Sequence, residues 1–296
     1  MHCHLAFSPD RRRIAEEARG AGAILFSNTV TPEEFSASAR ELAAFAPTPG
    51  QTPLAMGRTA ESGGVVVGLG LHPWQVESHT LDDRLARFDE LAAGTAVRLF
   101  GEVGLDFGAR HEREREAQLA AFEHVCRVAS ASAPPGTDDG EDGTAAPHTP
   151  RRPVLSVHAV RAAGAALDVL QSTGCLRRCT CVFHRFSGTS DELRRAIRAG
   201  CWFSVGSSMA RTRRGLAYAR QIPVERLLLE TDLPSAPGQR CDLATLEADL
   251  ALTLSALASA RGVEDAALAA TVEANARGAL GLSGAVPDDP RRPFPS

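Results

Sequence analysis

The sequence predicts a parallel α/β protein built as a single closed barrel. Short apolar or β-branched stretches alternate with longer amphipathic segments along the 296 residues. Eight short stretches can be distinguished, and this number favours a (β/α)8, or TIM, barrel over an open doubly wound sheet. No G-x-G-x-x-G sequence follows the first stretch, which argues against a dinucleotide-binding fold.

The expected elements follow from the hydrophobic periodicity. Strands are predicted at 23–29, 65–72, 97–107, 154–158, 179–184, 201–207 and 227–232. Residues 2–5 could form the stub of one more strand. Because only Met1 precedes them, we expect either a misassigned start codon or a truncated first strand with a fraying end. Amphipathic segments predict helices at 32–45, 81–93, 112–129, 160–172, 190–199 and 212–221.

Two segments lie outside this alternation. Residues 130–152 are rich in Pro, Gly, Asp and Thr without apolar periodicity, which predicts a disordered surface loop. Residues 286–296 are Pro-rich and predict a flexible C-terminal tail. The barrel is therefore expected to be one domain over residues 1–285.

The composition excludes several kinds of chemistry. All 32 basic residues are arginine, so there is no lysine for a Schiff base, a Walker-type phosphate site or a carbamylated metal bridge. The net charge of −4 argues against a surface that coats nucleic acid, although local phosphate contacts remain open. The seven cysteines are odd in number and scattered, which predicts reduced thiols without disulfide partners. We expect a cytoplasmic protein without a membrane partner, because the start lacks the order of a signal peptide.

Ionisable residues are concentrated where the predicted strands end. Catalytic groups of a parallel barrel come from the C-terminal ends of its strands. The residues found there are His2, His4, His72, Glu102, His158, His184 and Asp232. Because residues i and i+2 of a strand share a face, His2 and His4 can reach one cation, and such ligands suit zinc, manganese or iron better than calcium. A surface histidine pair is the alternative.

Glu102 is the most informative acidic residue. It lies in GEVGLD within an apolar strand, and a buried glutamate needs a cation, an arginine or a shifted pKa. A salt bridge to arginine is the alternative to a metal. Asp106 is a candidate ligand or loop cap of lower rank. Cys175, Cys179 and Cys181 lack the paired C-x2-C spacing of structural zinc sites, so a thiolate centre is not expected.

Six ordered motifs resemble the TatD family of metal-dependent hydrolases, among the amidohydrolase-like barrels. They are HCHL at 2–5, GLHP at 70–73, GEVGLD at 101–106, VLSVHAVRA at 154–162, VFHRFSGT at 182–189 and LLLETDLPS at 227–235. EANARGAL at 273–280 is similar to the closing helix of the family. The resemblance runs along nearly the whole chain.

The resemblance implies a deoxyribonuclease, often a 3′→5′ exonuclease, with two divalent cations such as magnesium, manganese or zinc. The first cation would be held by His2, His4, Glu102 and Asp232, and the second by Glu102, His158 and His184, with Glu102 bridging. Two cations can generate a hydroxide and stabilise both oxygens of a phosphodiester displacement.

Within this resemblance we hypothesise that Asp232 binds metal and takes the proton of the attacking water. His72, Arg161 and Arg185 are candidate contacts to the phosphate or leaving group. Because His2 and His4 are expected on a fraying end, their site should hold its cation more weakly than the His158/His184 site.

Two alternatives remain open from the sequence. The same centre could hydrolyse an ester or amide, such as a D-aminoacyl-tRNA, because a fold does not determine the substrate. A degenerate barrel that binds a partner without catalysis is the other alternative.

Overall fold

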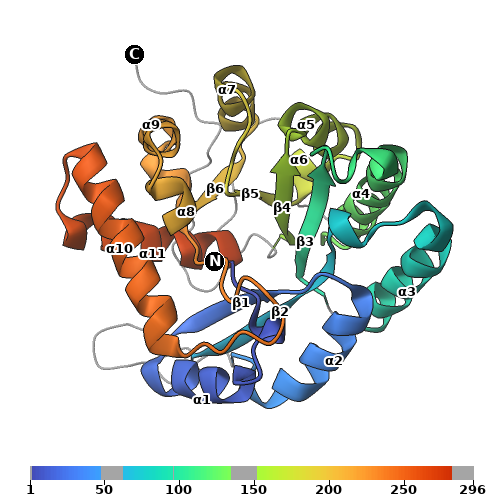
Figure 1. The fold of residues 1–296 in the computed structure, drawn as a ribbon, viewed down its shortest axis with the longest axis horizontal. Coiled ribbons are helices and arrows are strands. Elements are labelled where there is room, and N and C mark those ends of the chain that lie inside the picture. The colour runs from blue at the N-terminus through green and yellow to red at the C-terminus, as the bar shows by residue number, and fades with distance from the viewer. Residues whose placement is uncertain (1, 48–62, 96, 135–151, 282–296) are drawn as a thin grey trace.

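The computed structural model describes residues 2–47, 63–95, 97–134 and 152–281 (Figure 1). Seven parallel strands form one sheet in sequential order, and the sheet curves so that the helices lie around its outside (Figure 1). The strands are β1 (Ile24–Asn28), β2 (Gly64–Leu71), β3 (Leu99–Asp106), β4 (Val154–Val160), β5 (Thr180–His184), β6 (Trp202–Val205) and β7 (Leu227–Leu229). The predicted parallel α/β barrel is confirmed.

The predicted eighth strand is present only as an extended N-terminal segment. Cys3 forms a single parallel bridge with Ser27 of β1. On the other side, the Asp232 N–H donates to the His2 carbonyl over 3.1 Å, and the His4 N–H donates to the carbonyl of Leu233 over 2.9 Å. The segment therefore joins β1 to the chain that follows β7. The expectation of a fraying end is wrong, because hydrogen bonds hold the segment on both sides.

Six helices lie where the periodicity predicts them, and the other helices in the described part of the chain were not predicted from it. The helices are α1 (Arg11–Ala21), α2 (Pro32–Leu42), α3 (Leu81–Gly94), α4 (Arg115–Ala131), α5 (Ala163–Ser172), α6 (Cys175–Arg178), α7 (Ser190–Arg198), α8 (Ser207–Ala210), α9 (Arg213–Gln221), α10 (Leu243–Arg261) and α11 (Asp265–Leu280). Capping side chains determine several starts. Thr31 accepts the Glu34 N–H at the start of α2, and Thr189 forms a capping box with Glu192 at the start of α7.

Some predicted boundaries are wrong by a few residues. β4 continues to Val160, so His158 lies two residues before its end and the helix that follows begins at Ala163. β7 ends at Leu229, because the backbone of Asp232 bonds to the N-terminal segment instead of to β6. Residues 130 and 131 belong to α4, although they were predicted to begin a disordered loop. Most of that loop and the predicted tail lie outside the described residues.

α10 is the longest helix in the described part of the chain. It is long and apolar enough to cross a membrane by its 19-residue length and mean hydropathy of 1.3, although a core helix of a soluble protein can meet the same criteria. It contacts α8, α9 and α11, as an outer helix of this fold does. The expected absence of a membrane partner stays a prediction.

An irregularity in β3 places Glu102. The register of β3 shifts between Phe100 and Val103 against β4, and such bulges re-aim side chains. Gly104, with φ of 139°, then allows the close approach of β4, since a Cβ there would lie 2.1 Å from the His158 carbonyl oxygen. Gly104, the second glycine of GEVGLD, thus allows Glu102 on β3 and His158 on β4 to lie close together.

Candidate metal centre

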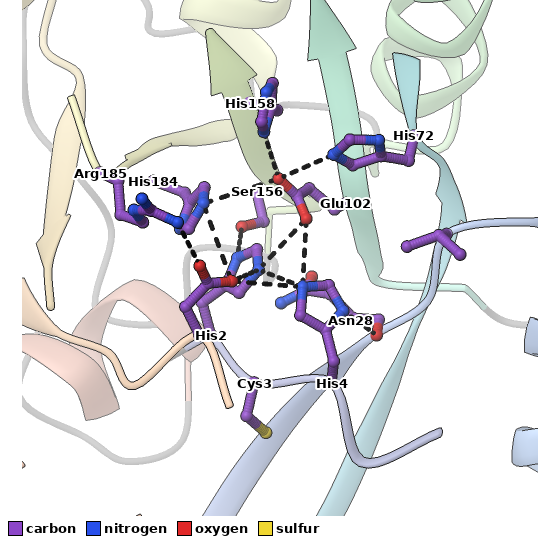
Figure 2. A network of polar contacts seen from close by, with 12 residues as sticks. His2, Cys3, His4, Asn28, His72, Glu102, Ser156, His158, His184 and Arg185 are labelled. Carbon is purple, nitrogen blue, oxygen red and sulfur yellow. Dashed lines mark hydrogen bonds and ion pairs between the residues drawn. The ribbon is translucent and has the colours of Figure 1, made fainter. Parts of the chain in front are cut away.

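The candidate site lies at the C-terminal ends of the strands, where imidazole and carboxylate groups surround Glu102 (Figure 2). The N-terminal segment, β3, β4, β5 and the segments after β2 and β7 each contribute. The side chains are His2, His4, His72, Glu102, His158, His184 and Asp232. The six residues other than Asp232 are at most 8% exposed, so their polar atoms need partners other than bulk water.

His2 and His4 direct the same nitrogen toward one point. Their Nε2 atoms lie 3.1 Å apart, while the Nδ1 of His2 contacts Ser156 Oγ at 2.8 Å. The Nδ1–H of His4 donates to the Asn28 carbonyl over 3.1 Å, so a neutral ring at this position carries its lone pair on Nε2. Hydrogen bonds at the far nitrogen are the usual means of orienting a metal-ligating histidine.

Two carboxylate oxygens face the same point. Glu102 Oε2 lies 3.4 Å from His2 Nε2 and 3.2 Å from His4 Nε2. Asp232 Oδ1 lies 3.6 Å and 3.4 Å from the same two atoms. Two imidazole nitrogens and two carboxylate oxygens therefore converge, and this donor set fits zinc or manganese. The ligand atoms of His2, His4 and Asp232 lie within 4.8 Å of one another.

The second predicted ligand group is only partly assembled. Glu102 Oε1 lies 2.6 Å from His158 Nδ1 and 3.6 Å from His184 Nε2. The two imidazole rings are 6.1 Å apart. The groups whose ligand atoms lie within 4.8 Å of one another instead combine Glu102 with His2 and His184, or with His72 and His158. The other ring nitrogen of His158, Nε2, is buried and lies 3.5 Å from Asp106 Oδ2, so Nδ1 is the His158 atom that faces Glu102.

Glu230 contacts the ring nitrogen of His184 that faces away from Glu102. It is 0% exposed, and its Oε1 lies 2.9 Å from His184 Nδ1 while Ser204 Oγ donates to its Oε2. Burial lowers the pKa of His184, but the Glu230 and Glu102 carboxylates outweigh it and raise the pKa. A carboxylate at Nδ1 holds the proton there and leaves Nε2 as the ligand atom.

We expect the Glu230→Gln variant to bind divalent cations about 10- to 100-fold more weakly, the range typical of such supporting residues. The substitution keeps the shape of the side chain but removes the charge that makes His184 a better ligand. Isothermal titration with manganese measures the effect. An affinity equal to that of the wild type would show that Glu230 does not support a ligand.

The buried charges are balanced by protons where no cation is bound. Burial lowers the pKa of His4, but its contacts with Asp232 and Glu102 raise that pKa to about 10. The pKa of His2 is lowered to about 4, mainly by its burial and to a smaller extent by the neighbouring His184. Burial raises the pKa of Glu102, but His72 and His184 bring it well below its ordinary value. An anionic Glu102 beside a protonated His4 is a charge arrangement in which a divalent cation can replace the proton.

His72 differs from the other histidines. Its Nδ1 accepts the backbone N–H of Trp74 over 3.1 Å, so a neutral ring carries its proton on Nε2. That Nε2 lies 3.4 Å from Glu102 Oε1. His72 therefore acts as a hydrogen-bond donor toward anionic oxygen. With Glu102 and His158, His72 also forms one of the groups whose ligand atoms lie within 4.8 Å of one another.

Asp106 caps a loop and also approaches the centre. Its Oδ1 accepts the Gly108 N–H over 2.7 Å, and its Oδ2 accepts the indole N–H of Trp74 over 2.6 Å. The same Oδ2 lies 3.5 Å from His158 Nε2. The loop-capping role considered for Asp106 is thus present in the structure.

The two predicted arginines lie at strand ends with different surroundings. Arg185 donates to Asp232 Oδ2 over 2.5 Å, and its side chain is 45% exposed. Arg161 is exposed just after β4 and makes no hydrogen bond or ion pair with the described residues. The structure therefore brings Arg185, but not Arg161, into contact with the centre.

Arg161, Arg185 and Asp232 are the described non-glycine residues with left-handed backbones, with φ of 52°, 43° and 59°. Such conformations cost free energy and cluster at functional sites. All three follow strands at the end of the sheet where the centre lies.

Three supporting groups were not identified from the sequence. Glu230 lies within the LLLETD motif, two residues before Asp232, and a second carboxylate in an apolar stretch was a usable signal. Ser156 lies two residues before His158 on β4, which places it on the same face. The Asn28 contact uses a backbone carbonyl, so no residue type could have indicated it.

A parallel α/β barrel that gathers imidazole and carboxylate groups at the C-terminal ends of its strands is the arrangement of a metal-dependent hydrolase. The sequence matches the family described as TatD related DNase over residues 1–135 and 151–281. The chain belongs to this family, and the resemblance of its motifs is confirmed.

Two curated relatives illustrate the match. A 3′-5′ ssDNA/RNA exonuclease TatD of Dickeya dadantii is 31% identical over 231 residues, covering 77% of this chain and 74% of that protein. Deoxyribonuclease Tat-D of Schizosaccharomyces pombe is 29% identical over 175 residues, covering 56% of this chain. The match to the yeast protein spans 50% of that protein's length.

Solved structures confirm the fold. A TatD homologue from Escherichia coli K12 superposes with a TM-score of 0.67 at 21% identity, covering 95% of this chain and 96% of that one. A TatD family hydrolase from Entamoeba histolytica gives a TM-score of 0.63 at 14% identity, covering 96% and 97%. At these identities the likeness concerns the fold alone.

Proposed function

We propose that this protein is a divalent-metal-dependent nuclease that hydrolyses phosphodiester bonds at the 3′ ends of single-stranded DNA in the cytoplasm. The observation that carries the proposal is the pair of Nε2 atoms of His2 and His4, 3.1 Å apart and facing two carboxylate oxygens. The printed names of the relatives, which include deoxyribonuclease and 3′-5′ ssDNA/RNA exonuclease, support the substrate class.

Two cation sites share Glu102 in this proposal. His2, His4, Asp232 and Glu102 would hold the first cation, and Glu102, His158 and His184 would hold the second. The opposite directions of the two glutamate oxygens support this division. Magnesium, manganese and zinc are the candidate ions, and the mixture of imidazole and carboxylate ligands favours zinc or manganese. Bound divalent cations lower the pKa of water and offset negative charge on a phosphodiester.

The protein side chains orient the substrate and move the proton. Asp232 accepts the proton of the attacking water on its carboxylate, which Arg185 holds from the Oδ2 side. The Nε2–H of His72 donates to a non-bridging phosphate oxygen. Arg185 and the exposed Arg161 supply planar donors for the remaining phosphate oxygens. With a net charge of −4, these local contacts must supply the attraction for DNA.

A cleavage assay tests the proposal. We expect a 5′-labelled single-stranded oligonucleotide to be shortened from its 3′ end with manganese, magnesium or zinc, and to remain intact with EDTA. A 3′-labelled copy should release its label in the first product. The duplex form of the same sequence should be cleaved more slowly.

Two controls make the assay specific. The Glu102→Gln variant, purified identically, reveals contaminating nuclease if it retains activity. A D-aminoacyl-tRNA is the comparison substrate, because the same centre can attack an ester. Metal-dependent release of the amino acid without cleavage of any nucleic acid would contradict the proposal.

A further inference from the structure

We propose that Trp74 and His111 form a platform on which an unpaired nucleobase stacks beside the reacting phosphate. The inference rests on the proposed nuclease function and deepens it by assigning the group that recognises the base. None of the residues that surround Glu102 has an exposed aromatic face, so the platform is a separate element of substrate binding.

Trp74 is an exposed aromatic residue at an unusual place. It lies in the 3-10 turn Pro73–Gln75 directly after His72, and 54% of its surface is exposed. This exposure leaves part of the indole open to a ligand, next to the residues that surround Glu102. Its Nε1–H donates to Asp106 Oδ2 over 2.6 Å, which holds the indole in one orientation.

His111 stacks against one face of the Trp74 indole and braces it. The imidazole and indole planes are within 10° of parallel, with ring centroids 5.3 Å apart. The other neighbours meet Trp74 at steep angles, His72 at 77° and His158 at 72°. The indole is thus braced at its edges while its broad faces lie parallel to His111. A prearranged pair of this kind loses little conformational entropy when a third ring is added.

The location connects the platform to the cation centre. The indole centroid is 6.0 Å from the imidazole of His158, a candidate ligand. A base stacked on Trp74 therefore belongs to a nucleotide whose phosphate lies at or next to the centre. Arg110 is exposed one residue before His111, and it makes no ion pair with the described part of the chain, so it is available to the backbone of the same strand.

The chemistry of the platform favours an unpaired base of any identity. Every base has a π face, and stacking on an aromatic side chain does not require a particular hydrogen-bond pattern. Bases within a duplex are already stacked on their neighbours, so they reach the indole only after unpairing. Purines, with the larger rings, should stack more strongly than pyrimidines. The platform thus provides a physical basis for preferring single strands.

Fluorescence gives a test that does not depend on turnover. Trp202→Phe leaves Trp74 as the only tryptophan, since the sequence contains two. We expect a short single-stranded oligonucleotide with phosphorothioate linkages at its 3′ end to quench the emission of this variant in the presence of magnesium. An oligonucleotide of the same length with abasic residues at its 3′ end should quench it much less.

Kinetics test the same platform. We expect Trp74→Ala to raise KM for single-stranded DNA about 5- to 100-fold, with a smaller change in kcat, because stacking is worth about 1–3 kcal/mol per base. Trp74→Phe keeps a ring but loses the indole N–H, and it should raise KM less than about threefold. Trp202→Phe is the matched control. Trp202 is the first residue of β6, at the end of the strand away from the candidate site, so its substitution should leave KM as in the wild type.

The outcomes separate the platform from the nuclease function. Equal increases in KM for the alanine and phenylalanine variants would overturn the platform, because the contact with Asp106 would then matter instead of the ring. Equal quenching by the abasic oligonucleotide would overturn it as well. Cleavage with unchanged KM in Trp74→Ala contradicts the platform alone. Base-dependent quenching without any cleavage contradicts the nuclease function alone.

Discussion

Replacing Glu102 by glutamine is expected to abolish both high-affinity cation binding and metal-dependent cleavage. One Glu102 oxygen faces His2 and His4, and the other lies 2.6 Å from His158. Glutamine keeps the volume but presents a neutral amide, so both cation groups lose a shared anionic ligand. Elemental analysis should find less than one equivalent of cation after dialysis, and cleavage should fall to background.

Thermal unfolding provides a second measurement. A cation at 100 times its Kd stabilises the folded state by about 2.7 kcal/mol. Each kcal/mol of stabilisation raises the Tm by roughly 2–4 °C in proteins of about 150–250 residues. The wild type should show this rise with added manganese and Glu102→Gln should not. Glu247→Gln, an exposed glutamate on α10, is the matched control and should respond like the wild type. A full rise in Tm for Glu102→Gln would show that Glu102 is not a shared ligand.

The Asp232→Asn variant should lose about three to four orders of magnitude in kcat while remaining folded. Loss of a general base typically costs 10²–10⁴-fold, and Asp232 also contributes an oxygen to the His2/His4 group. Burial raises the pKa of Asp232, but contacts with His4, His184 and His2 hold it below its ordinary value. The residue is therefore an anion in the wild type, and asparagine removes both its charge and its ability to accept a proton.

Single-turnover cleavage at saturating DNA measures this loss. The asparagine amide gives the Arg185 guanidinium a neutral partner in place of a carboxylate, which could destabilise the fold. Circular dichroism and the Tm therefore establish that the variant is folded. Asp168→Asn, which changes an exposed aspartate paired with Arg195, is the matched control and should keep wild-type kcat. A fall of less than tenfold in Asp232→Asn would remove this residue from the proton transfer.

The candidate histidines and carboxylates could be found from the sequence, because their positions relative to the apolar stretches indicated which residues lie near one another. His72 and His184 lie at the ends of apolar stretches and Glu102 lies within one, and parallel strands bring such ends to one edge of the sheet. For the same reason the pattern could not show which ligand atoms meet. His184 lies with His2 and Glu102 within 4.8 Å, whereas it was predicted to share a cation with His158.

The roles of His2 and Trp74 depended on long-range contacts. His2 was expected on a fraying end, but its carbonyl accepts the Asp232 N–H from the other end of the barrel. Trp74, the residue directly after GLHP, was not singled out from the sequence, since neither its exposure nor its parallel stacking on His111 has a local signal. Such contacts join residues that are far apart in sequence, where hydrophobic periodicity carries no information.

By itself, the sequence determined the parallel α/β class, the absence of lysine chemistry and the residues that could bind cations. These properties depend on composition and on periodicities of a few residues, which the chain carries locally. Only the tertiary structure decided how the sheet closes, which nitrogens of His2 and His4 face each other, and that Glu230 supports His184. Those features depend on strand register and side-chain rotamers, and both are set by packing across the whole barrel.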